Sequence, residues 1–137
     1  MIPDLQAQVF DCNRRFYDAF QRADADAMAD VWLHEDWVKC VHPGWPMIVG
    51  WSPIADSWRR IFTGHPALDV TIDHLSGHLE PLTAWITCLE RVAKQNLIQA
   101  TNVFLFRDDK WKMIHHHASA TPGVPVTAPP PSSGGAD

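Results

Sequence analysis

The sequence predicts an α+β fold in which three N-terminal helices pack in the concave face of a strongly bent, mostly antiparallel sheet. Up to Phe62, apolar residues recur every three or four positions, which is typical of helices. Beyond Gly64 the apolar period changes to two, which is typical of strands. At 137 residues the chain is too short for two full-sized domains. The economical packing is a sheet curled around the first helix, and such a cone has an open end.

The first half of the chain carries three predicted helices. Residues 4–21 place their apolar side chains on one helical face, and residues 27–32 form a short second helix behind capping aspartates. Ser52 as a cap and Pro53 at the first helical position predict a third helix over 54–62. The apolar stripe of that helix is Ile54, Trp58, Ile61 and Phe62.

Strands account for most of the remaining chain. Residues 37–41 read as a strand that stops at a His-Pro-Gly turn, and residues 47–49 pair back on it as the second arm of a hairpin. Four more strands follow, at about 70–75, 84–92, 100–107 and 111–119. The last two are joined by a predicted two-residue turn at Asp108-Asp109.

Residues 1–120 therefore read as a single domain, followed by a tail over 121–137. The tail is rich in Pro, Gly and Ser and has no large apolar side chain after Val126. Such a composition cannot bury enough surface to offset the entropy of ordering. We expect the tail to be disordered.

Charge and cysteine content exclude several classes of protein. Sixteen acidic against eleven basic side chains, with no basic cluster, argue against a nucleic-acid partner. No apolar run is long enough for a membrane span and the start lacks the pattern of a signal peptide, so we expect a cytoplasmic protein with no membrane partner. Three widely spaced cysteines fit neither a disulfide framework nor a zinc site, and no cofactor is expected.

The tract His115-His116-His117 is the most unusual feature of the sequence. Counting outward from a two-residue turn at Asp108-Asp109 places Asn102 opposite His115, with His117 two residues further along the same face. This register predicts that Asn102, His115 and His117 line one cavity, while His116 faces away. Two other interpretations stay open for the pair: histidines of the core bonded to their neighbours, or two ligands of a metal ion. A metal would need further ligands, and His42, Asp56 and Glu90 have no recognisable metal-site spacing, so no metal is expected.

Other residues could complete such a pocket. His42, in the turn after the first strand, is either an exposed turn residue or an acid or base at the pocket mouth. Trp45 and Trp58 are either ligand platforms or core residues, and Trp58 also belongs to the apolar stripe of the third helix. Glu90 would be a candidate general base if it were buried, but we expect it on the solvated outer face.

Several segments resemble the nuclear transport factor 2-like superfamily, and within it the SnoaL-like branch, which also includes the association domain of calcium/calmodulin-dependent protein kinase. They are Phe16-Tyr17, 40–45, 50–62, 100–104 and the last strand, 111–119. The resemblance implies a pocket at the wide end of a cone, with Tyr17 among the residues that bind a ligand, and dimerisation through the outer sheet face. Asn102 stands where the association domain carries an arginine, which disfavours a carboxylate ligand.

Two functions follow from these observations. The first is a domain that binds a small apolar molecule in a pocket lined by histidine and tryptophan, acting as a SnoaL-like cyclase or isomerase by general acid–base catalysis. Its catalytic residues would be His42, His115 and His117, and its ligand-binding residues Tyr17, Trp45, Trp58 and Asn102. The alternative is a non-catalytic homo-oligomerisation module. A deep pocket holding two histidine side chains favours the first, and either a filled cone or a histidine of the pair on the outer face favours the second.

A homodimer is expected in either case. The residues that predict it are Val103, Leu105 and Ile114, which the alternation places on the face of the sheet away from the helices.

Overall fold

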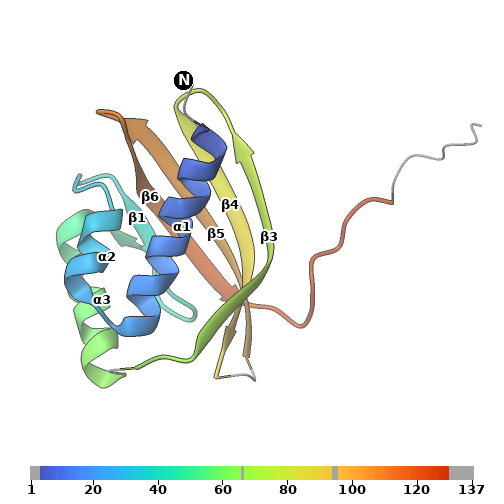
Figure 1. Cartoon of the computed structure of the whole chain (residues 1–137). Helices are drawn as coiled ribbons and strands as arrows, with labels where there is room; N and C mark the ends of the chain where they lie inside the picture. Colours follow the sequence, from blue (N-terminus) through green and yellow to red (C-terminus); the bar gives the residue numbers. More distant parts are fainter. Residues whose placement is uncertain (1–3, 66, 94–95, 130–137) are drawn as a thin grey trace, which may run out of the picture.

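The computed structural model describes residues 4–65, 67–93 and 96–129. The helices in these segments are α1 (Leu5–Arg22), α2 (Ala25–Val31) and α3 (Trp51–Gly64). The strands are β1 (Lys39–Val41), β2 (Ile48–Val49), β3 (Val70–Leu79), β4 (Thr83–Val92), β5 (Asn96–Arg107) and β6 (Lys110–Ala120). Figure 1 shows the helices gathered on one side of the sheet, with α1 lying along it. None of these helices is both long and apolar enough to cross a membrane.

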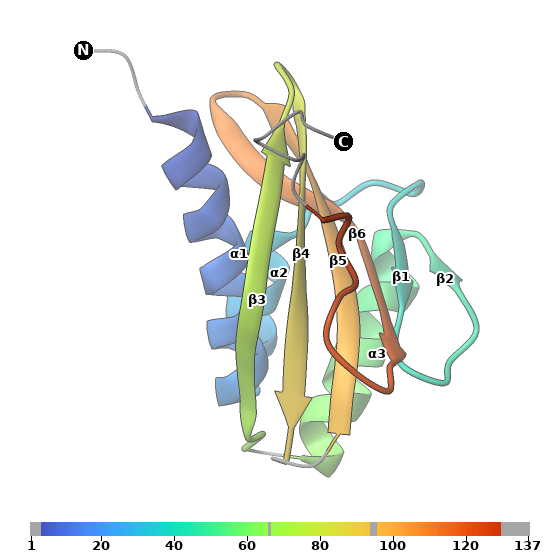
Figure 2. The same cartoon turned by 90° about the vertical axis from the view of Figure 1, so that its right-hand side faces the viewer.

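All six strands form one sheet in the order β2-β1-β6-β5-β4-β3. Every neighbouring pair is antiparallel except β1 and β6, which run parallel. The turned view in Figure 2 shows the same sheet with the helices behind it. The predicted α+β cone, with helices in the concave face of a mostly antiparallel sheet, is confirmed.

Helix α1 fixes the packing of the core. It begins after Asp4, whose side chain accepts a hydrogen bond from the backbone N–H of Ala7 at 3.0 Å. Its buried face carries Asn13, Phe16 and Tyr17 at helical spacing. The side chains of Asn13 and Tyr17 form hydrogen bonds with residues of the sheet and are part of the site described below.

Helix α3 begins earlier than the sequence indicated, and the predicted Ser52 cap is wrong. The capping position is Gly50, at φ 100°, and no side chain caps the helix. Glycine adopts this backbone conformation without steric penalty, and its N–H donates to the carbonyl of Val38 at 2.7 Å. The chain therefore turns directly from β2 into the helix, which places Trp51 at its first position.

The β5–β6 hairpin confirms the predicted turn. Asp108 and Asp109 both have positive φ, at 54° and 63°, as a two-residue turn of this kind requires. The pairs nearest the turn, Phe106 with Trp111 and Phe104 with Met113, follow the predicted register.

The register changes immediately afterwards. Val103 pairs with His115, so Ile114 is an extra residue that forms a β-bulge. One inserted residue reverses the faces of every side chain beyond it. Asn102 is thus opposite His116, not His115, and His117 is opposite Thr101. The predicted inward direction of His115 and His117, and the outward direction of His116, are wrong.

The chain beyond β6 has no helix or strand over residues 121–129, and the side chain of Val126 is 98% exposed. The last eight residues of the predicted tail, 130–137, lie outside the described residues. Its disorder stays a prediction.

Truncation before Gly123 is expected to leave the melting temperature unchanged within error, because the removed residues cannot bury a compensating apolar surface. Thermal unfolding of the full and truncated chains, followed by circular dichroism, measures this. A loss of several degrees in the truncated chain would show that the tail docks on the domain.

Candidate functional site

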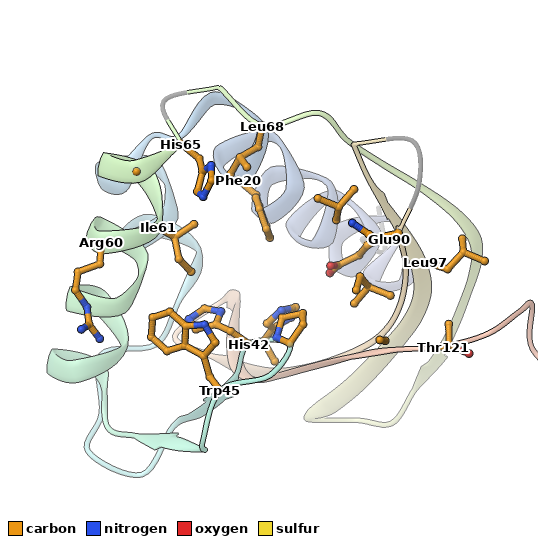
Figure 3. A pocket seen from close by; sticks show the side chains of 17 residues that line it. Phe20, His42, Trp45, Arg60, Ile61, His65, Leu68, Glu90, Leu97 and Thr121 are labelled. Carbon is orange, nitrogen blue, oxygen red and sulfur yellow. The ribbon is translucent and has the colours of Figure 1, made fainter.

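A cavity of about 770 Å³ opens at one end of the cone. Its walls come from the end of α1, from α3, from the loop after β1 and from the ends of β4, β5 and β6 (Figure 3). The lining residues are Phe20, His42, Pro43, Trp45, Arg60, Ile61, Gly64, His65, Leu68, Glu90, Val92, Asn96, Leu97, Ile98, His116, Ala120 and Thr121. Slightly more than half of these residues have apolar side chains, and the polar groups among them can orient a ligand.

The parallel pairing of β1 with β6 positions two histidines at this cavity. Cys40 of β1 pairs with His116 of β6, and both side chains are buried. His42 lies two residues beyond Cys40, on the same side of the chain. The two imidazole ring centroids are 6.5 Å apart. The β-bulge and the short strand β1 together bring these histidines to one site.

His42 is 3% exposed, so its interpretation as an exposed turn residue is wrong. Its Nε2 lies 2.8 Å from Ser57 Oγ of α3. Its ring meets those of Trp58 and Trp45 edge to face, with centroids at 4.6 and 4.9 Å. Burial lowers the pKa of His42 to about 4, so the imidazole is neutral at pH 7.

Glu90 is 2% exposed and lines the cavity, so its predicted place on the outer face is wrong. Figure 3 shows its carboxyl group pointing into the space between the strands and α3. Its only hydrogen bond among the described residues comes from the Tyr17 hydroxyl, which donates to Oε2 at 2.6 Å. Burial raises the pKa of Glu90 to about 7, although the bond from Tyr17 acts in the opposite direction.

A buried hydrogen-bond network connects Glu90 to His116 beneath the cavity. The Tyr17 hydroxyl accepts from Cys88 Sγ and from Asn102 Nδ2, each at 3.2 Å. Asn102 Nδ2 also donates to Asn13 Oδ1 at 2.8 Å. Asn102 Oδ1 lies 2.6 Å from His116 Nδ1. Buried networks of this kind hold their side chains in one arrangement.

His116, 1% exposed, is the end of that network at the cavity. Burial, followed by the charges of neighbouring histidines, lowers the pKa of His116 well below its ordinary value. Phe16 and Trp58 lie beside its ring, with centroids at 4.9 and 6.1 Å. The inner end of the cavity thus holds two neutral imidazoles and one carboxyl group that changes protonation near neutral pH.

Arg60 lies at the opposite rim of the cavity. Its guanidinium carbon is 5.2 Å from the centroid of the Trp45 ring, within cation–π distance. In the part of the chain that the structure describes, it forms no ion pair with a carboxylate, whereas its neighbour Arg59 bonds to Asp56. The cavity therefore has a charged rim and an uncharged or weakly acidic floor.

The predicted site residues occupy three places: the cavity lining, the layer of side chains beneath it, and the outer face of the sheet. His42 and Trp45 line the cavity. Tyr17, Trp58 and Asn102 lie beneath it, where they support the lining side chains. His115 and His117 occupy the outer face of the sheet, with ring centroids 6.1 Å apart. Among the described residues, no group of three or more His, Cys, Asp or Glu side chains could hold a metal ion.

The sequence interpretation placed both Glu90 and His116 on the outer face of the sheet, and considered Glu90 as a general base only if it were buried. Ala84, Ile86 and Cys88 share the parity of Glu90 on β4, and all three are fully buried. In β6, Met113 and Ala118 are both buried at a spacing of five, which an uninterrupted strand cannot place on one face. An odd spacing of this kind indicates an inserted residue. The sequence alone does not show this, because Ile114 and Ala118 have the even spacing of an uninterrupted strand.

Comparison with known proteins gives one family. A family model described as a SnoaL-like domain matches residues 9–123. A protein from Streptomyces avermitilis, described as a dehydratase of the NTF2-like family, is 28% identical with a TM-score of 0.80, and the match covers 89% of this chain and 100% of that one. A protein from Thiobacillus denitrificans, described as a calcium/calmodulin-dependent protein kinase type II association domain, is 27% identical with a TM-score of 0.76, over 80% of this chain and 92% of that one.

One similar curated protein is an F-box protein, SKIP8, of Arabidopsis thaliana. It is 28% identical over 112 residues, which is 81% of this chain. The match spans 48% of the plant protein, so this chain corresponds to about half of that relative's length.

Proposed function

This chain belongs to the SnoaL-like family, and on that basis we propose that it binds a small apolar molecule in the cavity and moves a proton on it by general acid–base catalysis. The observation that carries this proposal is the carboxyl group of Glu90. It is buried without a cationic partner in the described structure, at the end of an apolar cavity that also holds two neutral imidazoles. Groups with strongly shifted pKa values cluster at catalytic sites.

The arrangement divides the acid and base roles between two kinds of group. In its protonated form Glu90 can donate a hydrogen bond to the carbonyl oxygen of a substrate, which makes the adjacent C–H more acidic. His42 or His116, neutral at pH 7, can take the proton from that carbon. Return of that proton from the imidazolium to another carbon completes an isomerisation. Its transfer to a β-hydroxyl group, which then leaves as water, completes a dehydration and restores the neutral imidazole. The similarity to a protein described as a dehydratase supports this class of chemistry.

Exchange of α-hydrogens tests the proposal without knowledge of the natural substrate. We expect 2-tetralone, an apolar bicyclic ketone, to take up deuterium from D₂O faster with the protein than with buffer alone, as followed by proton NMR. The rate should be bell-shaped in pH. It rises as His42 loses its proton above about 4 and falls as Glu90 loses its proton above about 7. Exchange no faster than in buffer across this range would contradict the catalytic role.

A homodimer is the assembly we propose for this domain. Trp85 of β4 is 42% exposed on the outer sheet face and pairs with Val103 of β5. Leu105 follows Val103 two residues later and therefore lies on the same face. An apolar group of this kind on an open sheet favours a second copy as its cover. The similarity to a kinase association domain supports the same conclusion, and a non-catalytic oligomerisation module remains the second candidate function.

Light scattering after size-exclusion chromatography should give twice the mass of one chain. Val103→Glu should shift the protein toward monomer, since a buried unpaired carboxylate opposes association. Lys110→Glu, a change of charge at the exposed first residue of β6, is the control and should remain dimeric. A wild-type monomer at micromolar concentration would contradict the proposed dimer.

His115 and His117 on the outer face remove one argument for the pocket, and by itself that favours the module. The cavity is the stronger criterion. A vestigial cone would be filled by its own side chains, whereas this one leaves about 770 Å³ beside His42 and His116. Binding and proton transfer are therefore proposed first.

A further inference from the structure

The hydrogen-bond partners of His42 determine which of its ring nitrogens carries a proton. Ser57 Oγ lies 2.6 Å from the carbonyl oxygen of Ile54, and only the hydroxyl can donate in that contact. The single hydroxyl hydrogen is then used. The 2.8 Å contact between Ser57 Oγ and His42 Nε2 must be a bond that Nε2–H donates. His42 Nδ1 is thus left with a lone pair. The Cys40 thiol, a weak donor, lies at nearly equal distances from the two ring nitrogens, with Sγ 3.9 Å from Nδ1 and 3.8 Å from Nε2.

The same reasoning applies to His116, whose hydrogen-bond partner belongs to β5. Asn102 Nδ2 has two hydrogens, and they are donated to Asn13 Oδ1 and to the Tyr17 hydroxyl. Asn102 Oδ1 must therefore accept from His116 Nδ1–H across their 2.6 Å contact. His116 Nε2 is then the ring nitrogen with the lone pair. Two independent networks therefore leave His42 and His116, the two histidines at the inner end of the cavity, each with one ring nitrogen that accepts a hydrogen bond.

From these bonds we propose that the ligand of the cavity is a neutral, hydroxyl-bearing molecule, a phenol, enol or hydroxy ketone, whose O–H donates to an imidazole lone pair. This rests on the proposed function and names its substrate class. A carboxylate ligand has no hydrogen to donate at neutral pH, and it would also meet the ionised form of Glu90 at the same end of the cavity. The apolar body of the ligand would contact Phe20, Ile61 and Leu68.

Three naphthalene probes of the same ring size separate the possibilities. In calorimetric titrations at pH 7, 2-naphthol should bind about tenfold more tightly than 2-methoxynaphthalene, which keeps the oxygen but has no hydrogen to donate. Likewise, 2-naphthoate should bind most weakly. Equal affinity for the naphthol and its methyl ether would overturn the proposal. Tightest binding of the naphthoate would also overturn it, and would assign recognition to Arg60 at the rim.

His42→Phe is the variant that isolates the acceptor. Ser57 keeps its bond to Ile54 in this variant, so no buried polar group of α3 loses its last partner. The advantage of 2-naphthol over its ether should fall to about threefold or less, while affinity for the ether stays within twofold. His34→Phe, which changes an exposed histidine stacked on Trp51 at 4.5 Å, should keep the full advantage. An undiminished advantage in both His42→Phe and His116→Phe would contradict the assignment.

Binding involves no turnover, so the two proposals fail separately. Absence of deuterium uptake with a retained preference for 2-naphthol contradicts catalysis alone. Deuterium uptake without that preference contradicts the ligand class alone.

Discussion

Glu90→Gln is expected to slow deuterium uptake by 2-tetralone by roughly 10²- to 10⁴-fold, the usual contribution of a positioned acid or base. Glutamine keeps the shape of the side chain and can still accept a hydrogen bond from Tyr17. Its amide is a much weaker acid than the carboxyl group and stabilises a developing enolate less well. The amide also does not ionise, so the fall in rate through the pH of Glu90 ionisation should disappear from the residual activity. Rates measured by NMR between pH 4 and 9 test both effects.

The same substitution should make the protein more stable at alkaline pH. The pKa of Glu90 is raised from 4.5 to about 7 on folding, so its destabilising effect is absent below the unfolded value and complete above the folded one. The shift corresponds to about 3 kcal/mol of unfolding free energy. Denaturant unfolding at pH 8 should show Glu90→Gln more stable than the wild type by up to this amount, with the difference shrinking toward pH 5.

Glu80→Gln is the matched control, because Glu80 is exposed in the turn between β3 and β4. It should change neither the exchange rate nor the pH dependence of stability. A Glu90→Gln variant that keeps full activity would remove Glu90 from the proposed mechanism. Equal stability of variant and wild type at pH 8 would contradict the raised pKa.

Asn102→Leu is expected to have the largest effect on stability. Leucine has nearly the same size, but His116 Nδ1–H and Asn13 Oδ1 lose a partner, and the Tyr17 hydroxyl loses one of three. A buried polar group left without a partner costs about 1–3 kcal/mol, so the loss should reach about 3 kcal/mol or more. For a domain of this size that lowers Tm by roughly 10 °C or more.

Thr101→Val is the control for this substitution. Thr101 is the adjacent residue, on the outer face of the same strand, and pairs with Thr87 and His117. It should shift Tm by only a few degrees. An equal loss in the two variants would mean that the strand, and not the buried network, is sensitive to substitution. Differential scanning calorimetry at pH 7 makes the comparison.

The fold could be predicted from local patterns because each pattern acts within one element. Helical spacing in α1 and α3, the change of period after Gly64 and the Asp108-Asp109 turn each depend on neighbours in the sequence. The predicted capping residue of α3 was wrong. Ser52 and Pro53 together are a strong local signal for a helix start, but the capping position is Gly50, which is suited to it by its backbone conformation. Errors of this kind shift a boundary and leave the architecture unchanged.

The site depends on relations between elements, which the sequence expresses weakly. His42 was a candidate from its turn, but its burial depends on Ser57 and Trp58 of another element. Glu90 shares a strand with buried residues of both parities, Cys88 and Leu89, so alternation could not assign its face. The histidines were assigned to the wrong faces by one unpredicted bulge residue, Ile114.

That bulge also bears on how members of this family diverge. Deleting Ile114 would restore an uninterrupted strand and exchange the faces of the three histidines, with His115 and His117 turned toward the helices and His116 toward the outer surface. The change leaves every other letter of the sequence in place. Two homologues nearly identical over β6 could therefore carry different cavity floors and different association surfaces, according to the length of this strand. In an alignment of homologues, a single-residue gap at position 114 would therefore distinguish functional subgroups whose percentage identity is nearly the same.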